Sequence, residues 1–497
     1  MNSPIQFSHP WVGSPCEAEN VSTLHYRIDS EKSVITANLF ASVSYNQVVR
    51  TSGILLPIQS LPHDNSPGSL RSACVEAIGA FSSMGLGIWQ ILPLNPPDFV
   101  GSPYASPSAF ALDPDLLVPL AGDMPDPTPE DVDNWLAHNK WAESWSLYRL
   151  LKSKDSRSWT HWGLFSNPDK EMLESLRLEN YQAYENELIT QWKLAVSIKE
   201  IERTAKSCGI LLMGDLPLYV AHDSADVWSN KGLFNVELDG SPIELSGAPP
   251  DDFNHSGQFW GNPTYRWEDH ESTEFEWWRE RMRVAASRTP GIRLDHFIGI
   301  AEYWAIPGEA QDATFGAWKK GPGSKLLSAI LGIADFVIAE DLGMAGDDAI
   351  RLRDKYGLHG MSILQFGWGT EMPPHHINCV PDRVVAYTGT HDNDTFRGWY
   401  SKLPPNQREK VRKELGCPSS EIHKEAVKRL LQSNAEIVVI PLQDILGLGS
   451  SSRMNTPGMV SRRNWSWVSP DDWISRIKGS WFSESVKTSG RLPWSNE

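Results

Sequence analysis

The chain has 497 residues, which allows one large barrel with insertions or two to three domains. Charged residues make up 22% and aliphatic plus aromatic residues 40%, so a sizeable core is possible and global disorder is excluded. The net charge of −17 argues against nucleic acid and anionic membranes as partners.

The N-terminus and the cysteines favour a cytoplasmic protein. The opening stretch MNSPIQFSHPW has no basic segment followed by an apolar one, so we expect no signal peptide. No apolar run is long enough to span a membrane. The five cysteines are odd in number and none lies at CxxC spacing, which indicates reduced thiols and neither a disulfide framework nor a zinc site. Residues 1–50 are predicted to be a separate extension of unknown role.

Short apolar runs that end in polar residues predict buried β-strands. There are eight, at 53–58, 88–94, 209–216, 291–297, 335–342, 361–367, 383–392 and 436–445. They are nearly continuously apolar, as expected for strands buried on both faces. Helical patterns lie between several of them, at 69–85, 283–290 and 406–416. This alternation predicts an α/β fold, a (β/α)8 TIM barrel with helical and loop insertions between barrel strands.

The spacing of these runs is uneven, which indicates insertions in a catalytic barrel over 51–497. We expect the insertions at about 97–205 and 217–290. The first contains helical patterns at 134–153 and 184–207, and a Pro/Asp-rich stretch at 123–133 that predicts a loop.

Carboxylates gather where the predicted strands end. Arg293 and Asp295 are two apart on one strand, so their side chains should share a face. The ends of the runs also supply Asp215, Glu340, His391, Asp392 and Asp444. Because active sites of such barrels lie at the carboxyl ends of the strands, this set is typical of glycoside chemistry, which needs a carboxylate nucleophile and a carboxylic acid. The 22 tryptophans favour the same class of ligand, since flat aromatic faces stack on sugar rings.

Each of these residues also has a structural interpretation. A single Asp at a strand end usually caps the following helix, and Asp341 fits that description. Arg293 with Asp295 could be a buried structural ion pair, and His391 a core histidine. Metal ligation by the acids competes as well, but few histidines accompany them. The convergence of acids at the ends of three runs favours catalysis.

The motifs resemble the 4-α-glucanotransferases called amylomaltases, or disproportionating enzymes, of the α-amylase superfamily and glycoside hydrolase family 77. The segments that carry the resemblance are GIRLDHF, VIAEDLG and YTGTHDNDT, together with GILLPIQSLP (53–62), GSPYASPSAFALDP (101–114), MGDLPLYVAHDSADVW (213–228) and GAPPDDFNHSGQFWGNPTY (247–265). The resemblance covers about residues 50 to 470, and the last segment is nearly diagnostic of this family.

The resemblance implies a role for each matching position. Asp295 is expected to be the nucleophile, Glu340 the acid/base, two strand positions away around the rim, and Asp392 the third carboxylate, which stabilises the transition state. Arg293 would keep Asp295 ionised, because a near cation favours the charged form. The remaining implied contacts are with substrate: His391, Asp215, Tyr104 and Asp113 in the sugar pocket, and Asp251, Gln258 and Trp260 in a covering loop.

The implied activity is transfer of α-1,4-glucan segments between malto-oligosaccharides by a retaining double displacement, with release of glucose. The alternatives are an α-1,4-glucan hydrolase and a catalytically inactive glucan-binding barrel. We expect no cofactor and no metal, because no Gly-rich phosphate loop follows the first strand and no DxDxDG-type calcium loop is present. The expected partners are α-glucan donors and acceptors, and the expected assembly is a monomer or homodimer.

Overall fold

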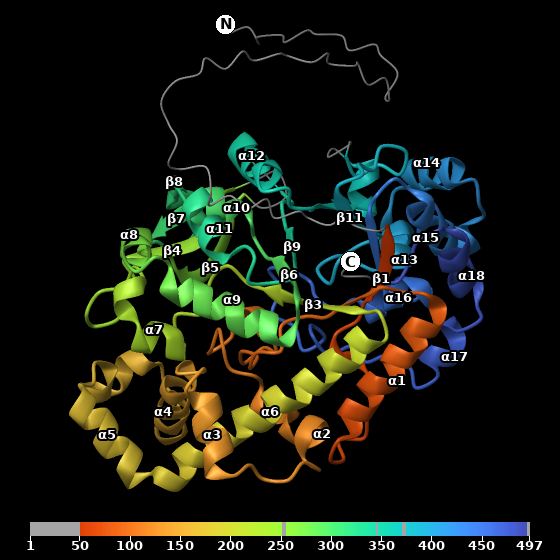
Figure 1. The fold of residues 1–497 in the computed structure, drawn as a ribbon. Helices are drawn as coiled ribbons and strands as arrows, with labels where there is room; N and C mark the ends of the chain where they lie inside the picture. Colours follow the sequence, from red (N-terminus) through yellow and green to blue (C-terminus); the bar gives the residue numbers. More distant parts are fainter. Residues whose placement is uncertain (1–49, 251–254, 344–345, 370–373, 495–497) are drawn as a thin grey trace, which may run out of the picture. The chain divides into compact units, whose positions relative to one another are not determined.

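The computed structural model describes residues 50–250, 255–343, 346–369 and 374–494, and its centre is a parallel β-barrel (Figure 1). The predicted extension at 1–50 lies outside the described residues but for Arg50. The eight barrel strands are β1 (Thr51–Leu55), β2 (Ile88–Gln90), β3 (Leu211–Leu216), β6 (Gly291–Leu294), β9 (Phe336–Ala339), β10 (Gly360–Ile363), β11 (Val384–Tyr387) and β12 (Ile437–Pro441).

These strands pair in chain order, from β1 to β12, and the last returns to the first. Thr51 of β1 lies opposite Ile437 of β12. The remaining gap, between β9 and β10, is bridged by one parallel contact, in which the Ala339 N–H donates to the His359 carbonyl at 2.8 Å. Each of the eight predicted runs overlaps one of these strands, so the predicted (β/α)8 TIM barrel is confirmed.

Alternate side chains of each strand decide what fills the barrel. Phe336 and Ile338 of β9 pack inside, against residues of every other strand except β6, whereas Val337 packs in the outer layer. On β6 the outer layer takes Ile292 and Leu294, which leaves Gly291 and Arg293 on the inner face. The barrel is therefore a packed core. Its interior is apolar except toward the carboxyl ends of the strands, where Arg293 carries charge.

Helices cover the barrel and fill the two longest connections. The helices other than short 3-10 turns are α1 (Ser69–Met84), α2 (Leu117–Ala121), α3 (Pro129–Leu136), α4 (Trp141–Lys154), α5 (Lys170–Glu179), α6 (Tyr181–Ser207), α7 (Ala225–Ser229), α8 (Trp267–Ser272), α9 (Glu276–Arg288), α10 (Ile298–Ala301), α11 (Ser324–Ile330), α12 (Asp347–Lys355), α13 (Phe396–Lys402), α14 (Pro405–Leu415), α15 (Ile422–Gln432), α16 (Leu442–Ile445), α17 (Trp473–Ile477) and α18 (Trp481–Thr488). Among the described residues, none of these is long and apolar enough to cross a membrane.

The predicted loop at 123–133 is partly wrong, because its second half begins helix α3. The Thr128 side chain accepts a hydrogen bond from the Asp131 N–H, and the Asp131 carboxylate accepts one from the Thr128 N–H. This capping box, with Pro129 at the first helical position, starts a helix within a proline-rich stretch. The helical pattern at 134–153 is divided between α3 and α4.

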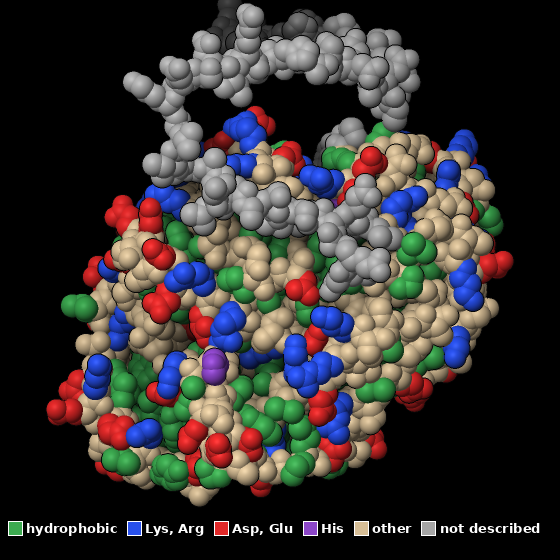
Figure 2. All heavy atoms as spheres, viewed as in Figure 1, with side chains coloured by type: hydrophobic (Ala, Val, Ile, Leu, Met, Phe, Trp, Pro, Cys, Tyr) green, Lys and Arg blue, Asp and Glu red, His purple; other side chains and the backbone are tan. Residues whose placement is uncertain are grey.

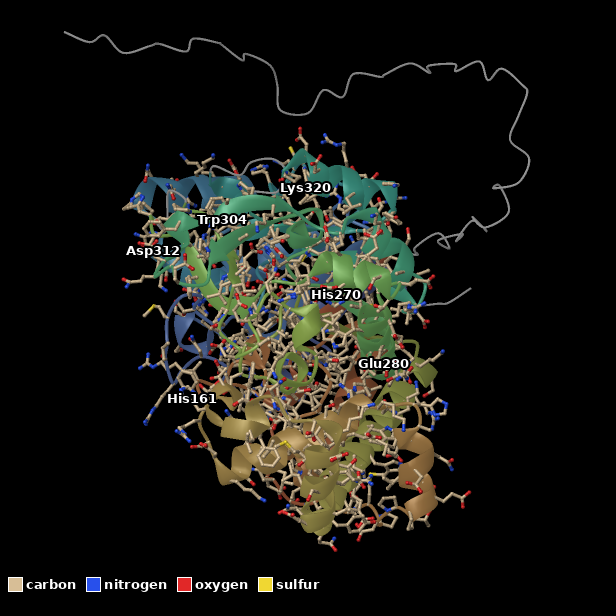
Figure 3. The ribbon with its side chains drawn as sticks, turned by 90° about the vertical axis from the view of Figure 1, so that its left-hand side faces the viewer. His161, His270, Glu280, Trp304, Asp312 and Lys320 are labelled. Atoms are coloured by element: carbon tan, nitrogen blue, oxygen red, sulfur yellow. The ribbon has the colours of Figure 1, made fainter. Side chains whose placement is uncertain are left out.

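A second sheet was not predicted from the sequence. Its four antiparallel strands run in the order β5 (Gln258–Pro263), β4 (Glu244–Ala248), β7 (Glu302–Pro307) and β8 (Ala317–Lys320). Figure 3 labels Trp304 of β7 and Lys320 of β8, and shows Trp304 on the side of the molecule opposite Glu280 of α9. The sheet joins the connection after β3 to the connection after β6, so it stands beside the rim where these strands end.

The C-terminal segment closes the end of the barrel opposite that rim. The buried Arg491 guanidinium donates to the carbonyls of Thr51, Leu431, Ser433, Ala435 and Glu436. Trp494 packs on Phe336, with ring centroids 5.1 Å apart, and its N–H donates to the Gly209 carbonyl. The chain end therefore ties the beginnings of β1, β3, β9 and β12 together.

Gly53 tests the close pairing of β1 and β2. A Cβ at Gly53 would lie 2.4 Å from the Ile88 carbonyl oxygen, which is backbone and cannot rotate away. We expect Gly53→Ala to lower the free energy of unfolding by about 1–3 kcal/mol. Gly79→Ala, in helix α1 with open space around the added Cβ, is the matched control and should raise it by about 0.5–1 kcal/mol. Denaturation curves give the change in the free energy of unfolding for each variant. Changes of the same sign in both variants would contradict the close pairing of β1 and β2.

Candidate active site

The carboxyl ends of β3, β6 and β9 bring the predicted acids together. Asp215 of β3 lies directly opposite Arg293 of β6 in the strand register. Leu294 of β6 lies opposite Ala339 of β9, so Asp295 and Glu340 follow at the same level. The prediction that Glu340 is two strand positions from Asp295 is wrong: the two acids leave neighbouring strands. Neighbouring parallel strands are about 4.8 Å apart.

Arg293 is the centre of this group. One of its terminal nitrogens, Nη1, lies 2.8 and 2.7 Å from the two oxygens of Asp215 and 2.7 Å from Oδ1 of Asp295. The Asp215 and Arg293 side chains are almost fully buried, whereas Asp295 keeps 26% of its side-chain surface exposed. The predicted sharing of a face by Arg293 and Asp295 is thus confirmed. A buried cation between two carboxylates compensates charges that would be costly alone.

Glu340 has the environment of a carboxylic acid. Burial, and to a smaller extent the negative charge of Asp295, raise the pKa of Glu340 to about 8, against the opposing effect of Arg293. Its two oxygens accept hydrogen bonds from the N–H groups of His296 and Leu342, at 2.9 and 3.1 Å. At pH 7 most of the protein therefore carries Glu340 protonated, next to a partly exposed Asp295.

A second cluster, from the connections after β2 and β11, contacts the first. Tyr104 donates from its hydroxyl to Asp215 at 2.7 Å and stacks on His391 at a centroid distance of 5.1 Å. Nε2 of His391 lies 3.3 Å from Asp392. Burial opposes the charged form of His391, but the neighbouring Asp392 raises its pKa above the usual value. Burial alone would raise the pKa of Asp392, yet the charge and hydrogen bond of His391 hold it well below the usual range.

Part of the predicted covering loop also reaches the rim. Trp260 of β5 is half-buried and lies edge-on to His296, with ring centroids 4.8 Å apart, and its indole N–H donates to the exposed Gln258 side chain at 3.2 Å. Asp251 lies outside the described residues. The indole therefore contacts the residue that directly follows Asp295 in the chain.

Three further acids make structural hydrogen bonds. Asp113 accepts from the Asp115 N–H and caps the 3-10 helix Pro114–Leu116, and its predicted place in the sugar pocket stays a prediction. Asp341 is not a helix cap; it accepts from the Met361 N–H at the start of β10 and pairs with Arg353. Asp444 is buried and accepts from the Thr388 hydroxyl and the Phe396 N–H.

The sequence analysis missed residues that hold the site in place. His296 adopts a left-handed backbone with φ of 50°, which turns its N–H toward Glu340. Asn455 donates to Asp392 at 2.6 Å, and Trp465, also left-handed, packs on Tyr104 and His391. Asn455 is a polar loop residue about sixty positions after Asp392, and nothing in the sequence indicates that the two side chains meet. Among the described residues, no group of three or more His, Cys, Asp and Glu side chains is placed to hold a metal ion.

Comparison with known proteins gives one consistent family. The family model described as 4-alpha-glucanotransferase, of glycoside hydrolase family 77, matches residues 56–125 and 121–472. The chain is 34% identical over 471 residues to a chloroplastic/amyloplastic 4-alpha-glucanotransferase of Arabidopsis thaliana, covering 85% of this chain and 82% of the relative. It is 34% identical over 479 residues to the 4-alpha-glucanotransferase of Thermus thermophilus, covering 85% and 95%.

Solved structures agree. An amylomaltase from Streptococcus agalactiae in complex with acarbose superposes with a TM-score of 0.82 at 27% identity, covering 89% of this chain and all of that one. An amylomaltase from Corynebacterium glutamicum, at 17% identity and a TM-score of 0.66, shares the fold.

The charge coupling within the site can be measured directly. Asp295→Asn removes a negative charge that raises the pKa of Glu340, so we expect that pKa to fall below about 8. Infrared titration of the protonated carboxyl band reports it. Asp347→Asn, which removes an exposed charge that does not contribute to the shifted pKa of Glu340, is the control and should leave the band unchanged. A Glu340 titration that is the same in both variants would mean that the two carboxyls do not interact.

Proposed function

Because the chain belongs to the 4-alpha-glucanotransferase family, glycoside hydrolase family 77, we propose that Asp295, Glu340 and Asp392 carry out its transfer of α-1,4-glucan segments. The observation that supports this most is the contrast between two half-buried acids on neighbouring strands: the pKa of Glu340 is raised to about 8, whereas Asp295 is paired with the Arg293 cation. Adjacent strand ends suit the separation of about 5–5.5 Å that retaining enzymes use between their two carboxyl groups.

The proposed reaction is a double displacement. Glu340 protonates the leaving glycosidic oxygen while Asp295 attacks the anomeric carbon, so the C–O bond breaks and a glycosyl ester forms. Glu340, now ionised, then takes the proton of an acceptor sugar hydroxyl, which attacks the same carbon and releases Asp295. Asp392 stays ionised beside His391 and stabilises the positive charge that develops on the sugar ring.

The surrounding side chains would bind the sugar next to the cleaved bond. His391 presents an imidazole, Tyr104 a phenol and Asp215 a carboxylate from three different segments. Asp215 is bonded to Arg293, Tyr104 donates to Asp215, and His391 is paired with Asp392. Rigid donors and acceptors of this kind hold a sugar in a reactive orientation. The donors and acceptors are malto-oligosaccharides, with glucose as a released product and acceptor. We place the enzyme in the cytoplasm, since Cys74, Cys208 and Cys417 are free thiols.

Incubation with pure maltotriose tests this function. Transfer gives glucose together with maltopentaose and longer chains, whereas hydrolysis gives only glucose and maltose. Products no longer than the substrate would point to a hydrolase, and unchanged maltotriose to an inactive glucan-binding barrel.

Removal of the acid should affect only donors that need one. Glu340→Gln cannot protonate a sugar leaving group, so maltotriose turnover should fall by several orders of magnitude, on the order of 10⁴. The fluoride ion of α-glucosyl fluoride leaves without protonation. A fluoride electrode should therefore still record the fluoride that is released when the glycosyl ester forms. Asp295→Asn is the matched control, inactive toward both donors. Equal loss toward both donors in Glu340→Gln would remove the acid role.

Trp260 should decide between transfer and hydrolysis. Its half-buried ring beside His296 offers an acceptor sugar a face to stack on and helps to exclude water from the glycosyl ester. Trp260→Ala should therefore lower transfer more than ester formation, and the ratio of free reducing ends to chain redistribution should rise. If Trp260 only packs the sheet, both rates fall together and the melting temperature drops, as large-to-small changes in a core cost about 3–5 kcal/mol.

A further inference from the structure

A large cleft lies on the outside of the molecule, away from the carboxyl ends of the barrel strands. It has a volume of about 830 Å³ and is formed by the turn between α3 and α4, by α7 and by α9. Pockets for small ligands usually measure about 300–1,000 Å³. Figure 2 looks onto the face where α9 lies and shows hydrophobic side chains in its hollowed lower left, with acidic and basic ones around them.

Aromatic side chains form part of the wall. Phe110 stacks on Trp141, with ring centroids 5.9 Å apart and planes at 15°, and meets Trp277 edge-on at 5.5 Å. Phe110 is buried, but Trp141 and Trp277 are only half-buried, so part of each indole remains accessible from the cleft. Accessible aromatic rings bind apolar faces of ligands.

The charges of the lining balance. Besides His138, three cations and three anions line the cleft: Lys140, Arg279 and Arg283, against Asp226, Glu276 and Glu280. Burial raises the pKa of Asp226 to about 6, which leaves it mostly ionised above pH 7. A site for an anion such as a nucleotide would need an excess of cations. A purely apolar ligand would leave unused those lining charges that have no partner in the protein.

Two of the charged groups are available to a ligand. Glu280 is paired with Arg283 at 2.6 Å, and Lys140 lies 3.4 Å from Glu143. Glu276 and Arg279, on successive turns of α9, are exposed and make no side-chain hydrogen bond or ion pair within the described part of the chain. Together they offer an acceptor and several donors beside the indole of Trp277.

We propose that this cleft binds a segment of an α-1,4-glucan chain, as a second site that anchors long substrates outside the catalytic barrel. A neutral ligand with apolar ring faces and many hydroxyl groups matches aromatic walls, balanced charge and free donors and acceptors at once. The choice of an α-glucan rests on the proposed function, because that is the polymer the enzyme would handle.

Filling the cleft tests the proposal. Ser144 lines it from the accessible side of α4, so Ser144→Trp should obstruct it. Ser153→Trp, at an exposed position of the same helix outside the cleft, is the matched control. In native gels that contain amylose, we expect Ser144→Trp to weaken retention by about fivefold or more, and Ser153→Trp to leave it unchanged. Maltotriose transfer should stay within about twofold of wild type in both variants.

The outcomes separate the alternatives. Equal amylose retention by the two variants would show that the cleft is only a packing gap. Weaker retention of Ser144→Trp on heparin but not on amylose would identify a polyanion site and overturn the proposal. If Ser144→Trp fails to fold, Glu276→Ala, which removes an exposed unpaired carboxylate, should still weaken retention. A protein that does not convert maltotriose, yet needs the cleft for retention on amylose, would contradict the proposed function and support this site.

Discussion

The ion pairs of one arginine hold the site together. Arg293 replaces an apolar side chain in the inner layer of the barrel, and its Nη1 contacts two carboxylates from neighbouring strands. Without the guanidinium, Asp215 would be a buried charge without a cation, and Tyr104, bonded to Asp215, would lose its anchor. The same cation limits how far the negative charge of Asp295 can raise the pKa of Glu340. Charge state and side-chain position therefore depend on the same contacts.

The barrel could be predicted because its strands are buried on both faces and read as apolar runs. The catalytic candidates could be predicted because acids at the ends of such runs have to meet at one rim. The second sheet could not be predicted, because β8 is exposed throughout and β5 is exposed in its first two residues and buried only at its last. Neither strand shows an apolar run. Asp444 illustrates the opposite failure, since an acid that accepts structural hydrogen bonds and a catalytic acid at a strand end look the same in a sequence. Only hydrogen-bond partners separate them.

The sheet and the barrel share the chain around Asp295. Asp295 follows β6, His296 turns back in a left-handed conformation, and α10 then leads directly into β7 of the sheet. The ring of His296 touches Trp260 of β5, while its N–H holds Glu340. A displacement of the sheet would therefore affect both Trp260, which contacts the His296 ring, and Glu340, which accepts from the His296 N–H. This continuity gives the connection after β3 a physical route to influence the chemistry.

The pairing of β1 with β12 has a consequence for synthesis of the protein. Thr51 finds its partner, Ile437, only after nearly four hundred intervening residues have been made, and Arg491 then binds carbonyls of both strands. Until β12 has left the ribosome, β1 presents an unpaired edge on one side. Nascent chains would therefore be exposed to aggregation for most of translation, and final closure would be a slow event dominated by contacts distant in sequence. A protein truncated before Arg491 would be expected to depend on chaperones even though every catalytic side chain is already present.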